Sequence, residues 1–175
     1  GGNATFSVST GANLGAAVIV NFAMSGLADF GAGVDFTLSG VTTYNGALGT
    51  GTVTLPAGAG PTVVVTLTVN DDSLVEGPED AIFTLTAGAQ YTTGAPATRS
   101  IADDDISAMT VLAAGSPNEA GPVNGSFTIT ATPAPVRNMS VNFQMSGSAS
   151  FTAAGDYTLA GAATFSNVTG IGSVT

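Results

Sequence analysis

Polar and apolar residues alternate in short segments along most of the chain, and no segment shows the period of about 3.6 residues typical of a helix. Such an alternation places one face of a strand in a core and the other face in water. The apolar positions hold mainly Val, Ala, Phe and Leu, interleaved with Thr, Ser and Gly, which suits half-buried strands. The pattern predicts strands over residues 4–10, 16–24, 51–55, 62–70, 80–87, 96–102, 107–113 and 125–132.

Turns rich in Gly and Pro separate the predicted strands, for example at residues 11–15 and 56–61. Residues 25–50 are long for a loop, and we expect a short strand or hairpin within them. Short antiparallel strands without predicted helices between them are typical of an all-β sandwich. We therefore expect an immunoglobulin-like antiparallel β-sandwich, with Phe residues such as Phe6 and Phe127 in its core.

The sequence repeats itself with a period of 121 residues. Residues 122–175 align with residues 1–54 without a gap, and 20 of the 54 pairs are identical. The triplet Val-Asn-Phe at 20–22, for example, recurs at 141–143. An ungapped match of this length indicates an internal duplication, and thus a tandem repeat.

The duplication is out of phase with the chain. The counterpart of the strand predicted at 107–113 would lie before residue 1, and the second copy stops where residues from 55 onward should follow. We expect residues 1–105 to form a sandwich lacking its first strand, and residues 106–175 to form the first half of a second sandwich. Either the chain is cut from a longer tandem array, or neighbouring chains complete each half. A half-sandwich exposes apolar faces and strand edges, so neighbouring repeats or identical chains are expected partners by strand complementation.

Composition excludes several functions. The chain has no Cys, His or Lys, and its basic residues are Arg99 and Arg137. Zinc, haem and iron–sulfur sites therefore lose their usual ligands, and Ser-His-Asp and Cys-His catalysis are excluded within the chain. A net charge of −10 disfavours binding to nucleic acid and to anionic membranes, which attract basic surfaces. No apolar run approaches the roughly 20 residues of a transmembrane helix, so no membrane insertion is expected.

Eight of the 12 acidic residues lie in two short stretches, five within 70–80 and three at 103–105. Carboxylates repel one another, so gathering them in one place destabilises the fold unless a cation neutralises their charge. If each strand reverses the direction of the last, both stretches and Asp35 come to the same end of the first sandwich. Calcium takes six to eight oxygen ligands in tolerant geometry, whereas magnesium keeps more water. The alternative is that these residues cap turns and keep the surface soluble.

The sequence thus predicts a site at which several Ca²⁺ ions could share ligands. The expected ligands in the first copy are the carboxylates of Asp35, Asp71, Asp72, Glu76, Glu79, Asp103, Asp104 and Asp105. We expect Asp29 and Asp80 to be surface charges. Asp80 could also contact the ligand residues without binding the ion itself.

The acidic stretches and the repeat together resemble the Calx-β family, the β-sandwich module of the sodium–calcium exchanger regulatory loop and of many large bacterial extracellular proteins. The family's pattern ends one strand in Asp-Asp, continues with Glu-Gly-x-Glu and closes with an Asp-rich run. Here the corresponding residues are Asp71-Asp72, Glu76-Gly77-Pro78-Glu79 and Asp103-Asp104-Asp105.

Two further elements carry the resemblance into the second copy. The family's Asp-Tyr/Phe-Thr element is similar to the residues that begin at Asp35 and at Asp156, and its early Glu matches Glu119. Glu119 and Asp156 are therefore the expected calcium ligands of the second copy. One departure is the segment 38–51, which is longer than the family usually carries.

The resemblance implies a non-catalytic structural or adhesive repeat, located outside the cell or on its surface, that calcium stiffens at the junction between domains. The alternative is a subunit of a surface filament or sheath, in which strands from neighbouring chains complete the sandwiches. Carboxylates crowded in loops without an aromatic cleft do not favour glycoside hydrolysis, so we expect no enzymatic activity. Four Asn-x-Ser/Thr sequons offer glycan attachment points, at Asn3, Asn124, Asn138 and Asn167.

Overall fold

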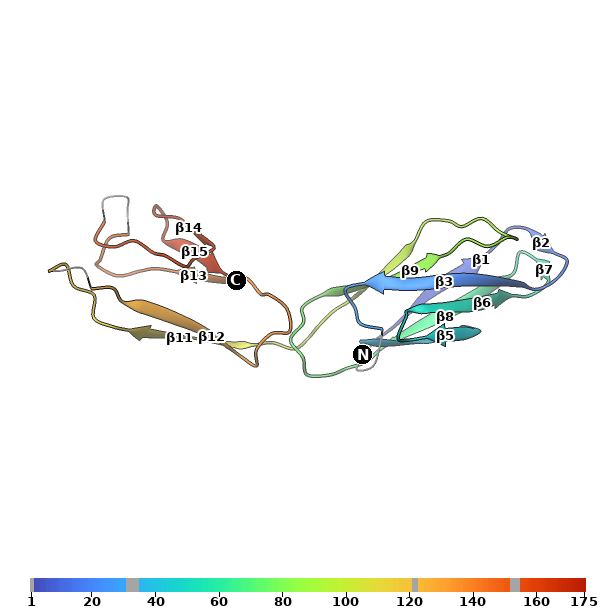
Figure 1. Ribbon diagram of the computed structural model, residues 1–175, viewed down its shortest axis with the longest axis horizontal. Coiled ribbons are helices and arrows are strands. Elements are labelled where there is room, and N and C mark those ends of the chain that lie inside the picture. The colour runs from blue at the N-terminus through green and yellow to red at the C-terminus, as the bar shows by residue number, and fades with distance from the viewer. Residues whose placement is uncertain (1, 31–34, 121–122, 152–154) are drawn as a thin grey trace. The chain divides into compact units, whose positions relative to one another are not determined.

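The computed structural model describes residues 2–30, 35–120, 123–151 and 155–175 (Figure 1). Every regular element within these ranges is a β-strand, which confirms the predicted all-β class. The described part of the chain holds no helix long and apolar enough to cross a membrane. The chain divides into two compact units, Gly1–Asp105 and Ile106–Thr175, which we call unit 1 and unit 2.

Two larger antiparallel sheets and a two-stranded ladder form unit 1 (Figure 1). One sheet has the order β1-β8-β4, with β1 (Asn3–Ser9), β8 (Thr62–Val69) and β4 (Phe36–Ser39). The other has the order β10-β9-β3-β6-β5, with β10 (Ala97–Ile101), β9 (Glu79–Leu85), β3 (Val18–Gly26), β6 (Thr50–Leu55) and β5 (Thr43–Asn45). The ladder pairs β2 (Asn13–Leu14) with β7 (Gly58–Ala59).

The two larger sheets share one hydrophobic core, built from the inward-facing positions of their strands. In β8, alternation buries Val65 and Leu67 completely. A stack of three buried Phe rings joins the sheets. The ring centroid of Phe83 in β9 lies 5.0 Å from that of Phe6 in β1 and 4.5 Å from that of Phe22 in β3. Phe83 therefore contacts both layers of the core.

The expected short strand or hairpin within residues 25–50 takes the form of two strands in different sheets. β4 pairs with β8, whereas β5 forms a hairpin with β6. The pairing of β5 with β6 stacks the ring of Tyr44 on that of Phe22, with 6.0 Å between their centroids.

Unit 2 contains two smaller antiparallel sheets. The first pairs β11 (Ala108–Ala114) with β12 (Ser126–Thr132). The second has the order β13-β15-β14, with β13 (Val141–Gln144), β15 (Ile171–Val174) and β14 (Thr164–Phe165).

Contacts recur in the two units at positions 121 residues apart. Phe22 pairs with Gly51 in unit 1, and Phe143 pairs with Gly172 in unit 2. In both pairs the Phe ring occupies the space that a Cβ on the glycine would need, which explains why glycine stands there. The turn closed by Asp35, described below, also has its counterpart at the same offset.

The expectation that Phe127 belongs to the core is wrong, since 57% of its side chain is exposed. Every residue of β11 is exposed as well. In unit 1, β8 pairs with β1 and β9 pairs with β3, and these two strands help to bury the apolar face of β1 and β3. Among the described residues of unit 2, no strands occupy these two places.

Candidate metal centre

Strand pairing brings three acidic segments to one end of unit 1. Asp35 directly precedes β4, and the pairing of Phe36 with Val69 places it beside the end of β8. The N–H of Asn70 accordingly donates to the backbone oxygen of Asp35, at 2.8 Å. The pairing of Ile101 with Glu79 places the run after β10 beside the same loop.

Asp35 lies at the centre of the first carboxylate group. Only 7% of it is exposed, and its Oδ2 accepts a hydrogen bond from the N–H of Asp29, at 2.6 Å. Asp35, Asp72 and Glu76 each offer one carboxylate oxygen, and these oxygens lie within 4.8 Å of one another. Asp72 is held in a tight turn, because its Oδ1 accepts from the N–H of Leu74 at 2.8 Å. The group thus combines one buried carboxylate with two that solvent reaches.

Asp103 ties the run after β10 to the loop after β8. Its Oδ2 accepts from the N–H groups of Glu76 and Gly77, at 2.7 and 2.6 Å, and its Oδ1 accepts from the N–H of Asp105 at 2.9 Å. These backbone donors, Gly77 first, hold the pKa of the Asp103 carboxyl below its usual value. Gly77 has a φ of 74°, in the left-handed region that favours glycine.

The second carboxylate group comprises Asp103, Asp104 and Asp105, which also offer oxygens within 4.8 Å of one another. Desolvation raises the pKa of Asp105, and repulsion by Asp103 and Asp104 raises it further. Smaller contributions to the raised pKa come from the charges of Asp72 and Asp71. The electrostatic interactions of Asp105 therefore connect the second group with the first.

Four predicted ligands lie in neither group: Asp71, Glu79, Glu119 and Asp156. Asp71 is exposed, directly after β8 and Asn70. Glu79, at the start of β9, is buried with 5% exposed. Glu119 and Asp156 are exposed residues of unit 2. The Oδ2 of Asp156 accepts from the N–H of Ser150 at 2.8 Å, which is the same contact that Asp35 makes in unit 1. This shared contact is a turn-closing bond and needs no metal.

Asp80 differs from the expected surface charge. It is half-buried, and its Oδ1 accepts a hydrogen bond from the N–H of Leu27 at 3.0 Å. This bond holds the chain where β3 ends, beside the start of β9. Sequence reasoning missed it because the donor lies 53 residues away in the chain.

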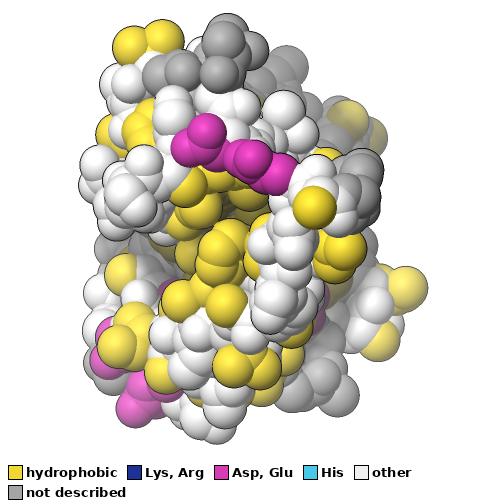
Figure 2. Space-filling view, turned by 90° about the vertical axis from the view of Figure 1, so that its left-hand side faces the viewer, with side chains coloured by type: hydrophobic (Ala, Val, Ile, Leu, Met, Phe, Trp, Pro, Cys, Tyr) yellow, Lys and Arg dark blue, Asp and Glu magenta, His cyan; other side chains and the backbone are white. Residues whose placement is uncertain are grey.

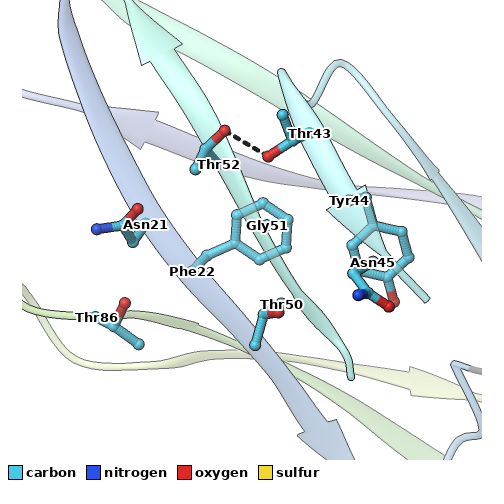
Figure 3. A pocket seen from close by; sticks show the side chains of 9 residues that line it. All are labelled: Asn21, Phe22, Thr43, Tyr44, Asn45, Thr50, Gly51, Thr52 and Thr86. Atoms are coloured by element: carbon cyan, nitrogen blue, oxygen red, sulfur yellow. Dashed lines mark hydrogen bonds between the residues drawn. The ribbon is translucent and has the colours of Figure 1, made fainter. Parts of the chain in front are cut away.

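A separate hollow of about 460 Å³ lies at the β3, β5 and β6 edge of unit 1 (Figure 3). Its polar lining consists of Thr and Asn side chains, and the Oγ1 atoms of Thr43 and Thr52 are hydrogen-bonded at 2.7 Å. Burial raises the pKa of Tyr44, which also lines it. No carboxylate is among the lining residues, so the candidate centre is the acidic end and not this hollow.

Fold and site together define an all-β protein of two units, the first of which carries two adjoining carboxylate groups at one end. A comparison of the chain with protein-family models, curated proteins and solved structures found no match in any of the three. The resemblance to Calx-β modules therefore rests on the residues quoted above.

The hydrogen bonds of Asp103 lead to a prediction for acid unfolding. Because the folded pKa is depressed, the ionised carboxylate stabilises unit 1 above the ordinary Asp pKa of about 3.9, and this contribution is lost as pH falls through the folded pKa. In EDTA at pH 7, Asp103→Asn should lower the free energy of unfolding by about 1–3 kcal/mol.

The decline in stability on acidification should also be shallower in Asp103→Asn than in the parent chain. Urea unfolding at a series of pH values from 7 to 3 measures both effects, with Asp104→Asn as the control at the exposed neighbour. Parallel pH profiles for Asp103→Asn and the parent would contradict the assignment.

Proposed function

We propose that unit 1 is an immunoglobulin-like β-sandwich that binds Ca²⁺ at its acidic end. We propose further that the chain is part of a tandem repeat with a non-catalytic structural or adhesive role outside the cell. The observation that carries the calcium site is the convergence of Asp35, Asp72 and Glu76, whose carboxylate oxygens lie within 4.8 Å of one another. Oxygens that share one Ca²⁺ ion, each at about 2.3–2.6 Å from it, must lie this close.

Two features of the site support the proposal that its carboxylates bind a cation and do not serve only to keep the surface soluble. Acidic side chains on a surface are common without an ion, but Asp35 is buried and adds little to solubility. Hydrogen bonds from the backbone also hold the carboxylate of Asp103 in place, which prepares it for a ligand. Desolvation and then repulsion by neighbouring carboxylates raise the pKa of Asp105, and a Ca²⁺ ion would offset this repulsion.

The place of the acidic run supports a mechanical role. Asp103–Asp105 is the last segment of unit 1, directly before unit 2 begins at Ile106. Calcium held by this run would restrain the residues that lead from one unit into the next. Contacts repeated at an offset of 121 residues support the tandem arrangement.

Asp105→Asn tests the calcium proposal through the sign of its effect. At pH 7 in EDTA, Asp105→Asn should leave the melting temperature unchanged or raise it, because the raised pKa means that the ionised carboxylate is disfavoured in the folded state. In excess Ca²⁺ the same substitution should lower the melting temperature relative to the parent, because a ligand is lost.

The expected rise in melting temperature follows from the linkage between calcium binding and folding. Calcium at about 100 times its dissociation constant adds about 2.7 kcal/mol to the stability of the parent. That gain corresponds to about 10–20 °C in a domain of this size. Differential scanning calorimetry in the two buffers measures the shift. An equal offset between Asp105→Asn and the parent in both buffers would exclude Asp105 as a ligand, and a parent melting temperature that does not rise in Ca²⁺ would contradict calcium binding.

The exposed apolar residues of unit 2 favour a second candidate function, a subunit of a surface filament or sheath. Phe127, Val111 and Leu112 are 57%, 67% and 71% exposed. Strands from neighbouring chains would cover such a face. Analytical ultracentrifugation separates the two functions, because a spacer segment stays monomeric whereas a subunit forms polymers at rising concentration.

A further inference from the structure

Unit 2 presents an open apolar core and two strand edges that no described strand covers. β12 pairs on one side with β11, and β13 pairs on one side with β15. A cavity of about 290 Å³ lies between these sheets, with Met109, Ile129 and Val141 among its lining residues. Hydrophobic side chains line a hollow in the end view of Figure 2.

Unit 1 shows what occupies the same two edges when the arrangement is complete. β8 pairs with β1, placing Val65 opposite Phe6, and β9 pairs with β3, placing Phe83 opposite Met24. β1 and β3 correspond to β12 and β13 at the offset of 121 residues. The segment that supplies these covering strands, residues 55–101, has no counterpart among the described residues of unit 2.

The exposed fractions of residues 121 positions apart show how much residues 55–101 contribute to burial in unit 1. Phe6 is 3% exposed, whereas its counterpart Phe127 is 57% exposed. Ala28 is 2% exposed and donates its N–H to the backbone oxygen of Asp80, at 3.1 Å. Its counterpart Ala149 is exposed. Identical residues thus differ in burial because strands are present in one unit and not in the other.

We propose that unit 2 is a docking site for a β-segment with the sequence of residues 55–101, inserted in the register that this segment has in unit 1. Phe127 would lie opposite the equivalent of Val65, and Met145 opposite the equivalent of Phe83. The inserted ring would then occupy, between Phe127 and Phe143, the place that Phe83 has between Phe6 and Phe22. This inference rests on the repeat in the proposed function and is independent of calcium.

The occupant is an additional copy of the segment and not the one in unit 1 of another chain. Residues 62–101 of unit 1 are already paired and buried there, so donating them would open one core in order to close another. A free segment closes the core of unit 2 at no such cost. Its strands would also remove apolar surface from water and satisfy the backbone groups along both edges.

The repeat allows a direct experiment. Thr175 corresponds to Thr54, so a second copy of residues 55–105 appended after Thr175 continues the chain in phase. The chain has no cysteine, so Ala149→Cys introduces a single thiol at the face to be covered. Ala28→Cys is the matched control in unit 1. Labelling rates of both are measured in EDTA with a thiol reagent, with and without the appended segment.

The appended segment should slow labelling at Ala149→Cys by about a hundredfold, because a buried group reacts only through local opening. Labelling at Ala28→Cys should be slow in both chains, which shows that unit 1 stays folded. Val65→Asp and Phe83→Asp, made in the appended segment only, should restore fast labelling at Ala149→Cys. Labelling of Ala149→Cys that stays fast with the unaltered segment would overturn the inference, and so would protection that survives the two Asp substitutions. Because EDTA is present, neither outcome depends on calcium binding.

Discussion

Replacing Phe83 with alanine is expected to reduce the stability of unit 1 by about 3–5 kcal/mol, the range found for truncation of a buried Phe. The ring is 3% exposed and stacks on Phe6 of one sheet and on Phe22 of its own sheet. Its removal leaves a cavity that both layers line and also breaks two aromatic contacts. Small domains have a total stability of about 5–15 kcal/mol, so this one change removes a large fraction of it.

Urea unfolding followed by circular dichroism measures this effect, and Phe127→Ala is the matched control. That substitution removes the same ring from a side chain that is 57% exposed, so its cost should stay within about 0.5 kcal/mol. If the two substitutions had equal effects, the ring stack would not be what joins the sheets.

Asp35→Asn is expected to weaken the calcium response of unit 1 by at least half while leaving its stability in EDTA close to that of the parent. The amide oxygen of asparagine can still accept the hydrogen bond that the N–H of Asp29 donates. The charge that would bind the ion is lost, and we expect calcium affinity to fall by at least tenfold, or about 1.4 kcal/mol. Asp35→Ala, which removes the acceptor as well, should in addition cost about 1–3 kcal/mol in EDTA.

Melting temperatures with and without Ca²⁺ distinguish the two roles of Asp35. Asp156→Asn provides the control, since Asp156 closes the same turn in unit 2 but belongs to neither carboxylate group of the described residues. The calcium response of unit 1 should be unchanged in that variant. A full calcium response in Asp35→Asn would show that the buried carboxylate serves only to close its turn.

Local pattern was sufficient to predict most of the strands. In β8, most residues are β-branched, and inward-facing Val65 and Leu67 alternate with outward-facing residues. This period of two predicts both the strand and its buried face. The two-residue strands β2, β7 and β14 were not predicted, because two residues cannot display a period. The four-residue strands β13 and β15 were not predicted either. Burial of Glu79 follows from the same alternation as that of Phe83, once β9 is known to begin at residue 79.

Contacts between distant segments set the limits of prediction. Residues 125–132 alternate much as residues 4–10 do, yet Phe127 is exposed, because burial depends on strands that pair from elsewhere in the chain. The assumption that each strand reverses the direction of the last predicted that the acidic segments lie at one end of the first sandwich. It did not predict that Asp103 accepts hydrogen bonds from Glu76 and Gly77, which lie 27 and 26 residues away.

Calorimetric titration of the whole chain with Ca²⁺, with Mg²⁺ in parallel, tests the central proposal most directly. The carboxylate groups at the end of unit 1 predict binding of at least one Ca²⁺ ion, weaker binding of Mg²⁺, and loss of the calcium heat in Asp71→Ala/Asp72→Ala. No heat of binding and no rise in melting temperature at millimolar Ca²⁺ would contradict it.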